Sequence, residues 1–148
     1  MPSFDYFVGR LQCPKCSYIT GETDESNMQT KIQEECNLSH LKVGSQLNMT
    51  PSKITGWGYF EVEKPIDPSE ISLIETWDCP NCGNSPNWAK ICISDRKIIS
   101  IETIVLSKSE ISRSNYLSEA VENQVGSLDW NKTKEEIIAN ILSKIEEP

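Results

Sequence analysis

Two short cysteine motifs of the same form, Cys-Pro-x-Cys, constrain this sequence of 148 residues more than any other feature. The first CPxC motif is Cys13-Pro14-Lys15-Cys16, and the second is Cys79-Pro80-Asn81-Cys82, which Gly83 follows. Each motif makes a tight turn that points two thiolates at one position, and two such turns supply the four ligands of a tetrahedral zinc site. We therefore expect one Zn²⁺ ion bound by Cys13, Cys16, Cys79 and Cys82. Four protein ligands leave no position for water or substrate, so the expected role of the ion is structural.

Two other uses of the cysteines have to be weighed against zinc. Six cysteines allow disulfides, and a single C-x-x-C motif also occurs in thioredoxin-like redox proteins. Residues 1–10 lack the basic and apolar regions of a secretory signal, and no stretch approaches the ~18 apolar residues of a membrane-spanning helix. We therefore expect a cytoplasmic protein without a membrane partner, in which thiols stay reduced. A redox dithiol would explain one motif but not both, so the pattern favours zinc.

The order of the segments predicts an α+β fold in one compact domain with a helical tail. We expect a mainly antiparallel β domain over residues 1–106, which contains a zinc ribbon formed by the two CPxC motifs. A long insertion, residues 17–78, separates the motifs within this domain. Residues 107–148 are expected to form a C-terminal helical segment that packs on the β domain.

Alternation and β-branched or aromatic residues predict the strands of the β domain. Strands are expected at 4–11, 17–20, 56–64, 71–77, 87–94 and 97–106, with a weaker candidate at 28–32. The tripeptide Ser94-Asp95-Arg96 predicts a hairpin between the last two long strands. The run from Ile98 to Leu106 is so rich in apolar residues that we expect it to be the central, buried strand of the sheet.

Capping boxes predict where the helices of the C-terminal segment begin. Ser107 with Glu110 opens one helix, and Thr133 with Glu136 opens another. Between them, a helical face is expected from Leu117, Ala120, Val121 and Val125, with Gly126 as its end. The last helix carries an apolar stripe at positions 137, 138, 141, 142 and 145. This stripe either packs on the protein's own sheet or is offered to a partner.

Negative charge limits the partners that the chain can have. The formal net charge is −8, and four zinc-bound thiolates would make the protein more acidic still. Nucleic-acid affinity comes mostly from Lys and Arg that neutralise phosphates, so we expect no direct nucleic-acid binding. The charge is concentrated in residues 57–78, which contain Lys64 as their only basic residue. The acidic residues there are Glu61, Glu63, Asp67, Glu70, Glu75 and Asp78.

One face of the strand expected at 56–64 combines aromatic and acidic side chains. By alternation, Trp57, Tyr59, Glu61 and Glu63 lie on one face of this strand, and Phe60 and Val62 lie on the other. Aromatic residues beside charge of one sign are typical of protein-binding surfaces. The expected partner-binding residues are therefore Trp57, Tyr59, Glu61 and Glu63. The alternative is that the aromatic side chains belong to the core and the acidic ones are merely solvated.

No set of residues predicts catalysis. His40 is the only histidine and has no triad partner beside it, which indicates a loop or surface role. Cys36 follows two glutamates that would raise the pKa of its thiol, and Cys92 lies between isoleucines as a small buried residue would. No phosphate-binding glycine loop is present. We therefore do not expect an enzyme.

The two CPxC motifs resemble the knuckles of a zinc ribbon, and this resemblance covers the motifs and their flanking hairpins. A small acidic chain without catalytic residues also resembles the immunity proteins that bacteria make against their own polymorphic toxins. That resemblance implies an inhibitor that binds a basic toxin domain directly, with charge complementarity steering the encounter. The alternative is a zinc-ribbon accessory protein of transcription or RNA metabolism that acts through protein contacts. A third class is an enzyme whose site lies in the insertion.

Overall fold

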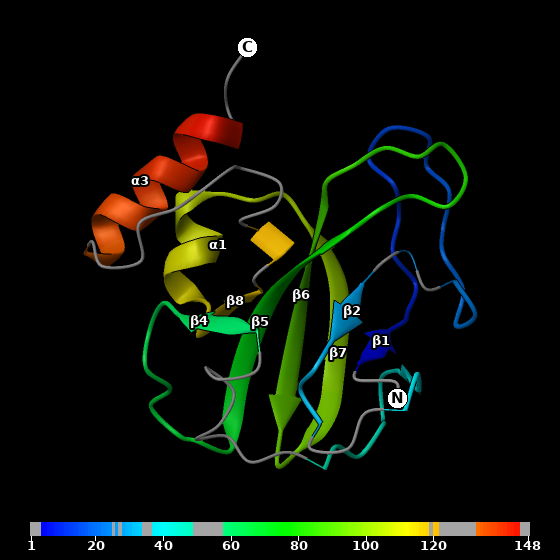
Figure 1. The fold of residues 1–148 in the computed structure, drawn as a ribbon, viewed down its shortest axis with the longest axis horizontal. Coiled ribbons are helices and arrows are strands. Elements are labelled where there is room, and N and C mark those ends of the chain that lie inside the picture. Colours follow the sequence, from blue (N-terminus) through cyan, green and yellow to red (C-terminus); the bar gives the residue numbers. More distant parts are fainter. Residues whose placement is uncertain are drawn as a thin grey trace.

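The computed structural model describes residues 4–24, 26, 28–33, 37–48, 58–118, 120–121 and 133–145. They form an α+β fold of two mixed sheets with helices packed beside them (Figure 1). The smaller sheet has the order β2-β1-β3, from β1 (Asp5–Phe7), β2 (Gln29–Thr30) and β3 (His40–Leu41). The larger sheet has the order β4-β8-β5-β6-β7, from β4 (Tyr59–Glu61), β5 (Glu70–Trp77), β6 (Asn87–Ser94), β7 (Lys97–Ile104) and β8 (Tyr116–Ser118). The helices are α1 (Lys108–Arg113) and α3 (Lys134–Ile145).

Strands β5, β6 and β7 form an antiparallel meander that confirms the predicted hairpin. Asp95 and Arg96 have φ angles of 50° and 62°, so both central residues of the turn are left-handed. A two-residue turn of this kind matches the right-handed twist of the strands that it joins. The prediction of a strand at 87–94 is confirmed by β6.

The run from Ile98 to Leu106 is not the central strand, so that prediction is wrong. Its residues 98–104 lie in β7, which is at the edge of the larger sheet, and Val105 and Leu106 follow the strand. Ile98 and Ile101 face the core, whereas Ile99 and Val105 are 55% and 85% exposed. The central strand is β5, which lies in the middle of the order β4-β8-β5-β6-β7. Both of its faces meet apolar layers. A count of apolar residues does not distinguish a strand buried on both faces from one that is half exposed.

Strand β8 lies inside the segment that was expected to be helical. It pairs in parallel with β5 and antiparallel with β4, so the helix predicted to begin at Leu117 is wrong at its start. Tyr116 and Leu117 are both buried, one against each face of the sheet. The spacing of Leu117 from Val121 fits a helix equally well, which is why the pattern was misleading. Val125 and Gly126 lie outside the described residues.

Two apolar cores hold the layers together. The first core lies between the two sheets and includes Phe7, Leu73 and Trp77. The second core lies between the larger sheet and the helices, and it includes Ile74 and Ile141. Leu73 and Ile74 are neighbours in β5, which shows directly that this strand is covered on both sides.

The C-terminal helix packs on its own protein. Ile138 and Ile141 are buried in the second core, and α3 contacts α1. Both predicted N-caps are confirmed: the Glu110 N–H donates to Ser107 Oγ at 3.2 Å, and the Glu136 N–H donates to Thr133 Oγ1 at 3.3 Å. No helix in the described part of the chain has the length and apolarity needed to cross a membrane.

Candidate metal centre

The fold brings the two CPxC motifs together at one end of the molecule. Figure 1 shows the first motif in the blue loop at the upper right, beside the green β5–β6 connection that carries the second. The Sγ atoms of all four cysteines lie within 4.8 Å of one another. The Sγ–Sγ distance is 3.7 Å between Cys13 and Cys82 and 3.6 Å between Cys16 and Cys79. The cluster predicted from sequence is therefore assembled from both motifs.

These distances fit a tetrahedral metal ion. A Zn–S bond of about 2.3 Å places neighbouring sulfurs of a tetrahedron about 3.8 Å apart. A disulfide would require about 2.05 Å, and all four residues are free thiols. Sulfur donors in this arrangement suit a soft or borderline metal. The cluster is thus consistent with a metal-ion site.

The two motifs have the same backbone structure. The N–H of Cys13 donates to the carbonyl of Tyr18 at 2.9 Å, and the N–H of Cys79 donates to the carbonyl of Asn84 at 3.1 Å. Each bond closes a short loop around its motif. The isolated bridge between Gln12 and Ile19 continues the first loop as a narrow hairpin.

Ser17 and Gly83 occupy equivalent positions just after the motifs. Their φ angles are 66° and 77°, and their N–H groups donate to the carbonyls of Cys13 and Cys79 at 3.0 and 2.9 Å. The first motif has no glycine at this position, but Ser17 adopts the left-handed conformation that glycine favours, so both motifs turn in the same way.

Further hydrogen bonds point at the sulfurs. The backbone N–H of Lys15 donates to Cys13 Sγ at 3.4 Å, and the Asn81 side-chain amide donates to Cys16 Sγ at 3.6 Å. The bond from Asn81 is the main reason why the pKa of Cys16 falls to about 6. Donors of this kind stabilise the thiolate form, which is the form that binds metal.

The inner side of the cluster is fixed to the first core. Cys13 and Cys79 are buried there with Trp77, the last residue of β5. The N–H of Asp78 donates to the carbonyl of Ser26 at 2.8 Å, and the N–H of Gln12 donates to Thr103 Oγ1 at 3.0 Å. The residue before the first motif is therefore bonded to β7, and the residue before the second motif is bonded to the turn at Ser26.

The strand face predicted to bind a partner is divided by the structure. Tyr59 is only 2% exposed and belongs to the first core, so this side chain is not part of an exposed contact face. Glu61 and Glu63 are exposed, as expected for a contact surface. Trp57 lies outside the described residues. Tyr59 lies on the side of the larger sheet that the smaller sheet covers, whereas Val62 packs against the second core on the other side.

A buried carboxyl group accounts for the position of Tyr59. Glu75 is 1% exposed on the central strand β5 and accepts a hydrogen bond from the Tyr59 hydroxyl. Burial raises the pKa of Glu75 to about 8, although the bonds from Tyr59 and Ser118 oppose the shift. In the sequence, Glu75 is one of the six acidic residues of segment 57–78. Its alternation with Leu73 and Trp77 is the signal that could have placed it in the core.

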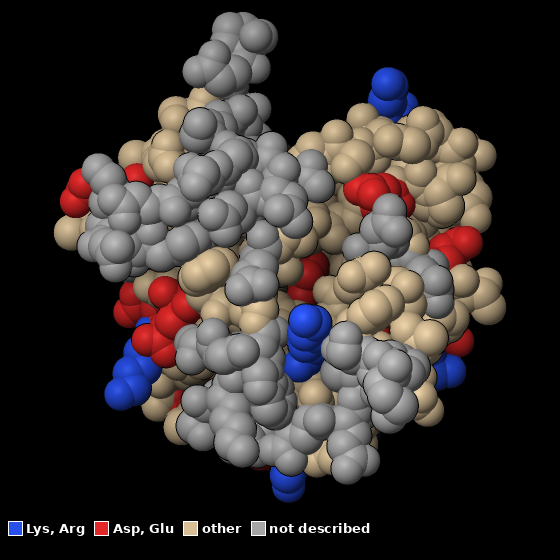
Figure 2. All heavy atoms as spheres, viewed as in Figure 1, with Lys and Arg blue, Asp and Glu red and all other residues tan. Residues whose placement is uncertain are grey.

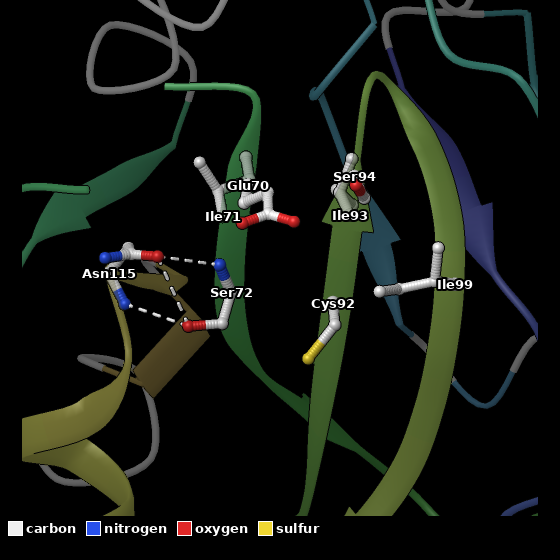
Figure 3. A pocket seen from close by; sticks show the side chains of 8 residues that line it. All are labelled: Glu70, Ile71, Ser72, Cys92, Ile93, Ser94, Ile99 and Asn115. Atoms are coloured by element: carbon white, nitrogen blue, oxygen red, sulfur yellow. Dashed lines mark hydrogen bonds between the residues drawn. The ribbon is translucent and has the colours of Figure 1, made fainter. Parts of the chain in front are cut away.

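A shallow groove on the larger sheet is the second place that could receive a ligand. Its volume is about 220 Å³, and Cys92 reaches it from the middle of β6 (Figure 3). Asn115 accepts a hydrogen bond from the Ser72 N–H at 2.9 Å, so the polar groups at this wall bond to each other. The lining residues are Glu70, Ile71, Ser72, Cys92, Ile93, Ser94, Ile99 and Asn115. The Cys92 thiol and the Glu70 carboxylate both belong to this lining, but in the strand register Cys92 is opposite Ser72, whereas Glu70 is opposite Ser94.

Three further residues were weighed from the sequence for a chemical role: His40, Cys92 and Cys36. His40 is exposed on β3, where its ring meets that of Tyr6 edge-on with the centroids 6.2 Å apart. Cys92 was expected to be buried but is partly exposed in the groove. Cys36 lies outside the described residues. Comparisons of the chain with protein-family models, curated proteins and solved structures give no match.

Proposed function

We propose that the four-cysteine cluster binds one Zn²⁺ ion, which stabilises the fold and takes no part in catalysis. The observation that supports zinc is the set of Sγ–Sγ distances, 3.6 and 3.7 Å, across the two motifs. All four positions around the ion would be filled by Cys13, Cys16, Cys79 and Cys82. An ion enclosed in this way has no open position for a reacting water.

We propose further that the protein is a non-enzymatic binding protein. The observation that carries this proposal is Ile66, whose side chain is 105% exposed in the loop between β4 and β5. Exposed acidic residues flank it on both sides in sequence: Glu61, Glu63, Asp67 and Glu70. Figure 2 shows Asp and Glu atoms gathered beside β4, on the side of the molecule where this loop begins. We call residues 61–70 the acidic loop.

The chemistry of the acidic loop fits a basic protein surface with an apolar pocket. The carboxylates would attract the partner and speed its association, and Ile66 would be the side chain buried in the contact. The Asp67 carboxylate accepts hydrogen bonds from the N–H and hydroxyl of Ser69, which lower the pKa of Asp67 and keep it charged. The partner class favoured by these features is the basic domain of a bacterial toxin, with this chain as its immunity protein.

The proposal is tested with the protein encoded immediately beside this gene, which the proposal expects to contain a basic toxin domain. Binding is measured by calorimetry for the wild type, for Ile66→Ala and for Val105→Ala. Val105 is the matched control, since it is also strongly exposed at 85% but lies outside the acidic loop. We expect Ile66→Ala to weaken binding about tenfold, or roughly 1.4 kcal/mol, and Val105→Ala to leave it unchanged. Equal affinity of all three proteins, or affinity that does not fall with added salt, would contradict the role of the acidic loop.

A further inference from the structure

The four cysteines of the metal centre differ sharply in their exposure. Cys13 and Cys79 are 1% and 2% exposed, whereas Cys16 is half-buried and Cys82 is exposed. The cluster is thus closed by the first core on its inner side and meets solvent on its outer side. A reagent that arrives from solvent reaches Cys82 before it reaches the other three sulfurs.

The two outer sulfurs also differ in what covers them. The side-chain amide of Asn81 donates a hydrogen bond to Cys16 Sγ at 3.6 Å. This bond withdraws electron density from the sulfur and occupies one side of it. Lys15 has the position equivalent to Asn81 in the first motif, and its bond to the cluster comes from the backbone N–H, at 3.4 Å to Cys13 Sγ. Of the two outer cysteines, Cys16 therefore has a side-chain hydrogen-bond donor next to its sulfur, and Cys82 is the more exposed residue.

We propose that Cys82 is the thiolate through which the metal centre reacts with peroxides, and that Cys13 completes the reaction by forming a disulfide with it. This inference rests on the proposed metal site, and the geometry that carries it is the exposure of Cys82 and the 3.7 Å between its Sγ and that of Cys13. The class of co-reactant is a hydroperoxide such as hydrogen peroxide. The product would be a protein without its ion, whose two CPxC motifs are covalently joined.

The reaction is balanced as two displacements. In the first, the Cys82 thiolate attacks one peroxide oxygen, the O–O bond breaks, and hydroxide leaves a sulfenic acid on Cys82. In the second, the Cys13 thiolate attacks the sulfenic sulfur, the S–O bond breaks, and a second hydroxide leaves as the S–S bond forms. Two thiolates lose one electron each, and the peroxide gains both. The ion then has two thiolate ligands in place of four and leaves the site.

The geometry selects Cys13 as the resolving residue. Its Sγ lies 3.7 Å from that of Cys82, and a disulfide requires the two sulfurs to approach to about 2.05 Å. Cys16 and Cys79 are as close to each other, at 3.6 Å, but this pair does not contain Cys82, the exposed cysteine on which the sulfenic acid forms. The expected disulfide therefore joins the two motifs instead of closing either one.

The test uses the full chain with Cys36→Ser and Cys92→Ser, so that only the four cluster thiols remain. The zinc-loaded protein is treated with less than one equivalent of hydrogen peroxide, released zinc is followed with a chromogenic chelator, and disulfides are located by peptide mass spectrometry. We expect one zinc released for each disulfide formed, and the disulfide to be Cys13–Cys82. A disulfide within either motif, or retention of zinc in excess peroxide, would overturn the proposal. Protein that contains no zinc before peroxide is added would instead refute the metal site itself.

Alkylation gives a second readout that does not depend on disulfide formation. With limiting iodoacetamide, Cys82 should be labelled first in the zinc-loaded protein. Asn81→Ala should raise the labelling of Cys16 several-fold, whereas Lys15→Ala at the equivalent position should not, because its backbone N–H is retained. Preferential labelling of Cys16 in the unmutated site, or equal effects of the two alanine variants, would contradict the assignment.

Discussion

The hydroxyl of Tyr59 donates a hydrogen bond to the carboxyl group of Glu75 and lies 2.6 Å from the hydroxyl of Thr30. Tyr59 and Glu75 belong to strands of the larger sheet, and Thr30 belongs to β2 of the smaller one. All three residues are buried. The two sheets are therefore joined by a polar contact inside the first core, and the Glu75 carboxyl group is part of it.

Replacing Glu75 by glutamine should remove a pH dependence of stability. The pKa of Glu75 is about 8 in the folded protein, against about 4.3 for an unperturbed glutamate, so the folded state binds more protons between these values. Its contribution to stability is fully present below the lower pKa and is lost as pH rises through the higher one. The advantage of Glu75→Gln over wild type should grow by on the order of 1 kcal/mol per pH unit between pH 5 and 8. Urea denaturation of both proteins, with zinc in excess, measures this difference.

Glu70→Gln is the matched control for this experiment. Glu70 begins the same strand but is exposed, so its removal should leave the difference from wild type independent of pH. Stability curves of Glu75→Gln and wild type that run parallel across this range would show that Glu75 ionises normally.

The parts of the fold that could be predicted from sequence are those with local signals. The CPxC spacing identified Cys13, Cys16, Cys79 and Cys82, and capping residues identified the starts of both helices. The rest depends on contacts distant in sequence. Strand β8 is a strand because β4 and β5 flank it, and Glu75 is buried because the smaller sheet covers it. Neither the strands that flank β8 nor the sheet that covers Glu75 can be predicted from the residues next to them in the sequence.

Gly83→Ala tests the backbone geometry of the second motif. Gly83 has a φ angle of 77°, and a Cβ there would meet no atom within 4 Å, so the substitution introduces backbone strain without a clash. We expect a loss of about 1 to 2 kcal/mol and faster transfer of zinc to a chelator. Gly44→Ala is the control, since Gly44 has a φ angle of 95°, equally open space and a position outside both motifs. Gly44→Ala should lower the melting temperature without changing the rate of zinc transfer. Equal rates of zinc transfer for Gly83→Ala and Gly44→Ala would contradict this account.

Ile141→Ala tests whether α3 is part of the folded domain. Ile141 is fully buried in the second core, so its truncation should destabilise the protein by about 2 to 5 kcal/mol. Leu142 is only partly buried against the same core, and Leu142→Ala should have a clearly smaller effect. Thermal unfolding of the two variants makes the comparison. Equal and negligible shifts would mean that α3 does not pack as described.

The metal content of the purified protein tests the central claim most directly. Elemental analysis of protein that has never met a chelator should give about one zinc per chain, because the four thiolates form a single closed site. Cys79→Ser should lose both the metal and cooperative folding, since structural zinc contributes on the order of 10 kcal/mol or more. Cys92→Ser, which replaces a partly exposed thiol outside the cluster, should retain both. Wild-type protein that folds cooperatively without zinc, or that carries iron in its place, would contradict the account.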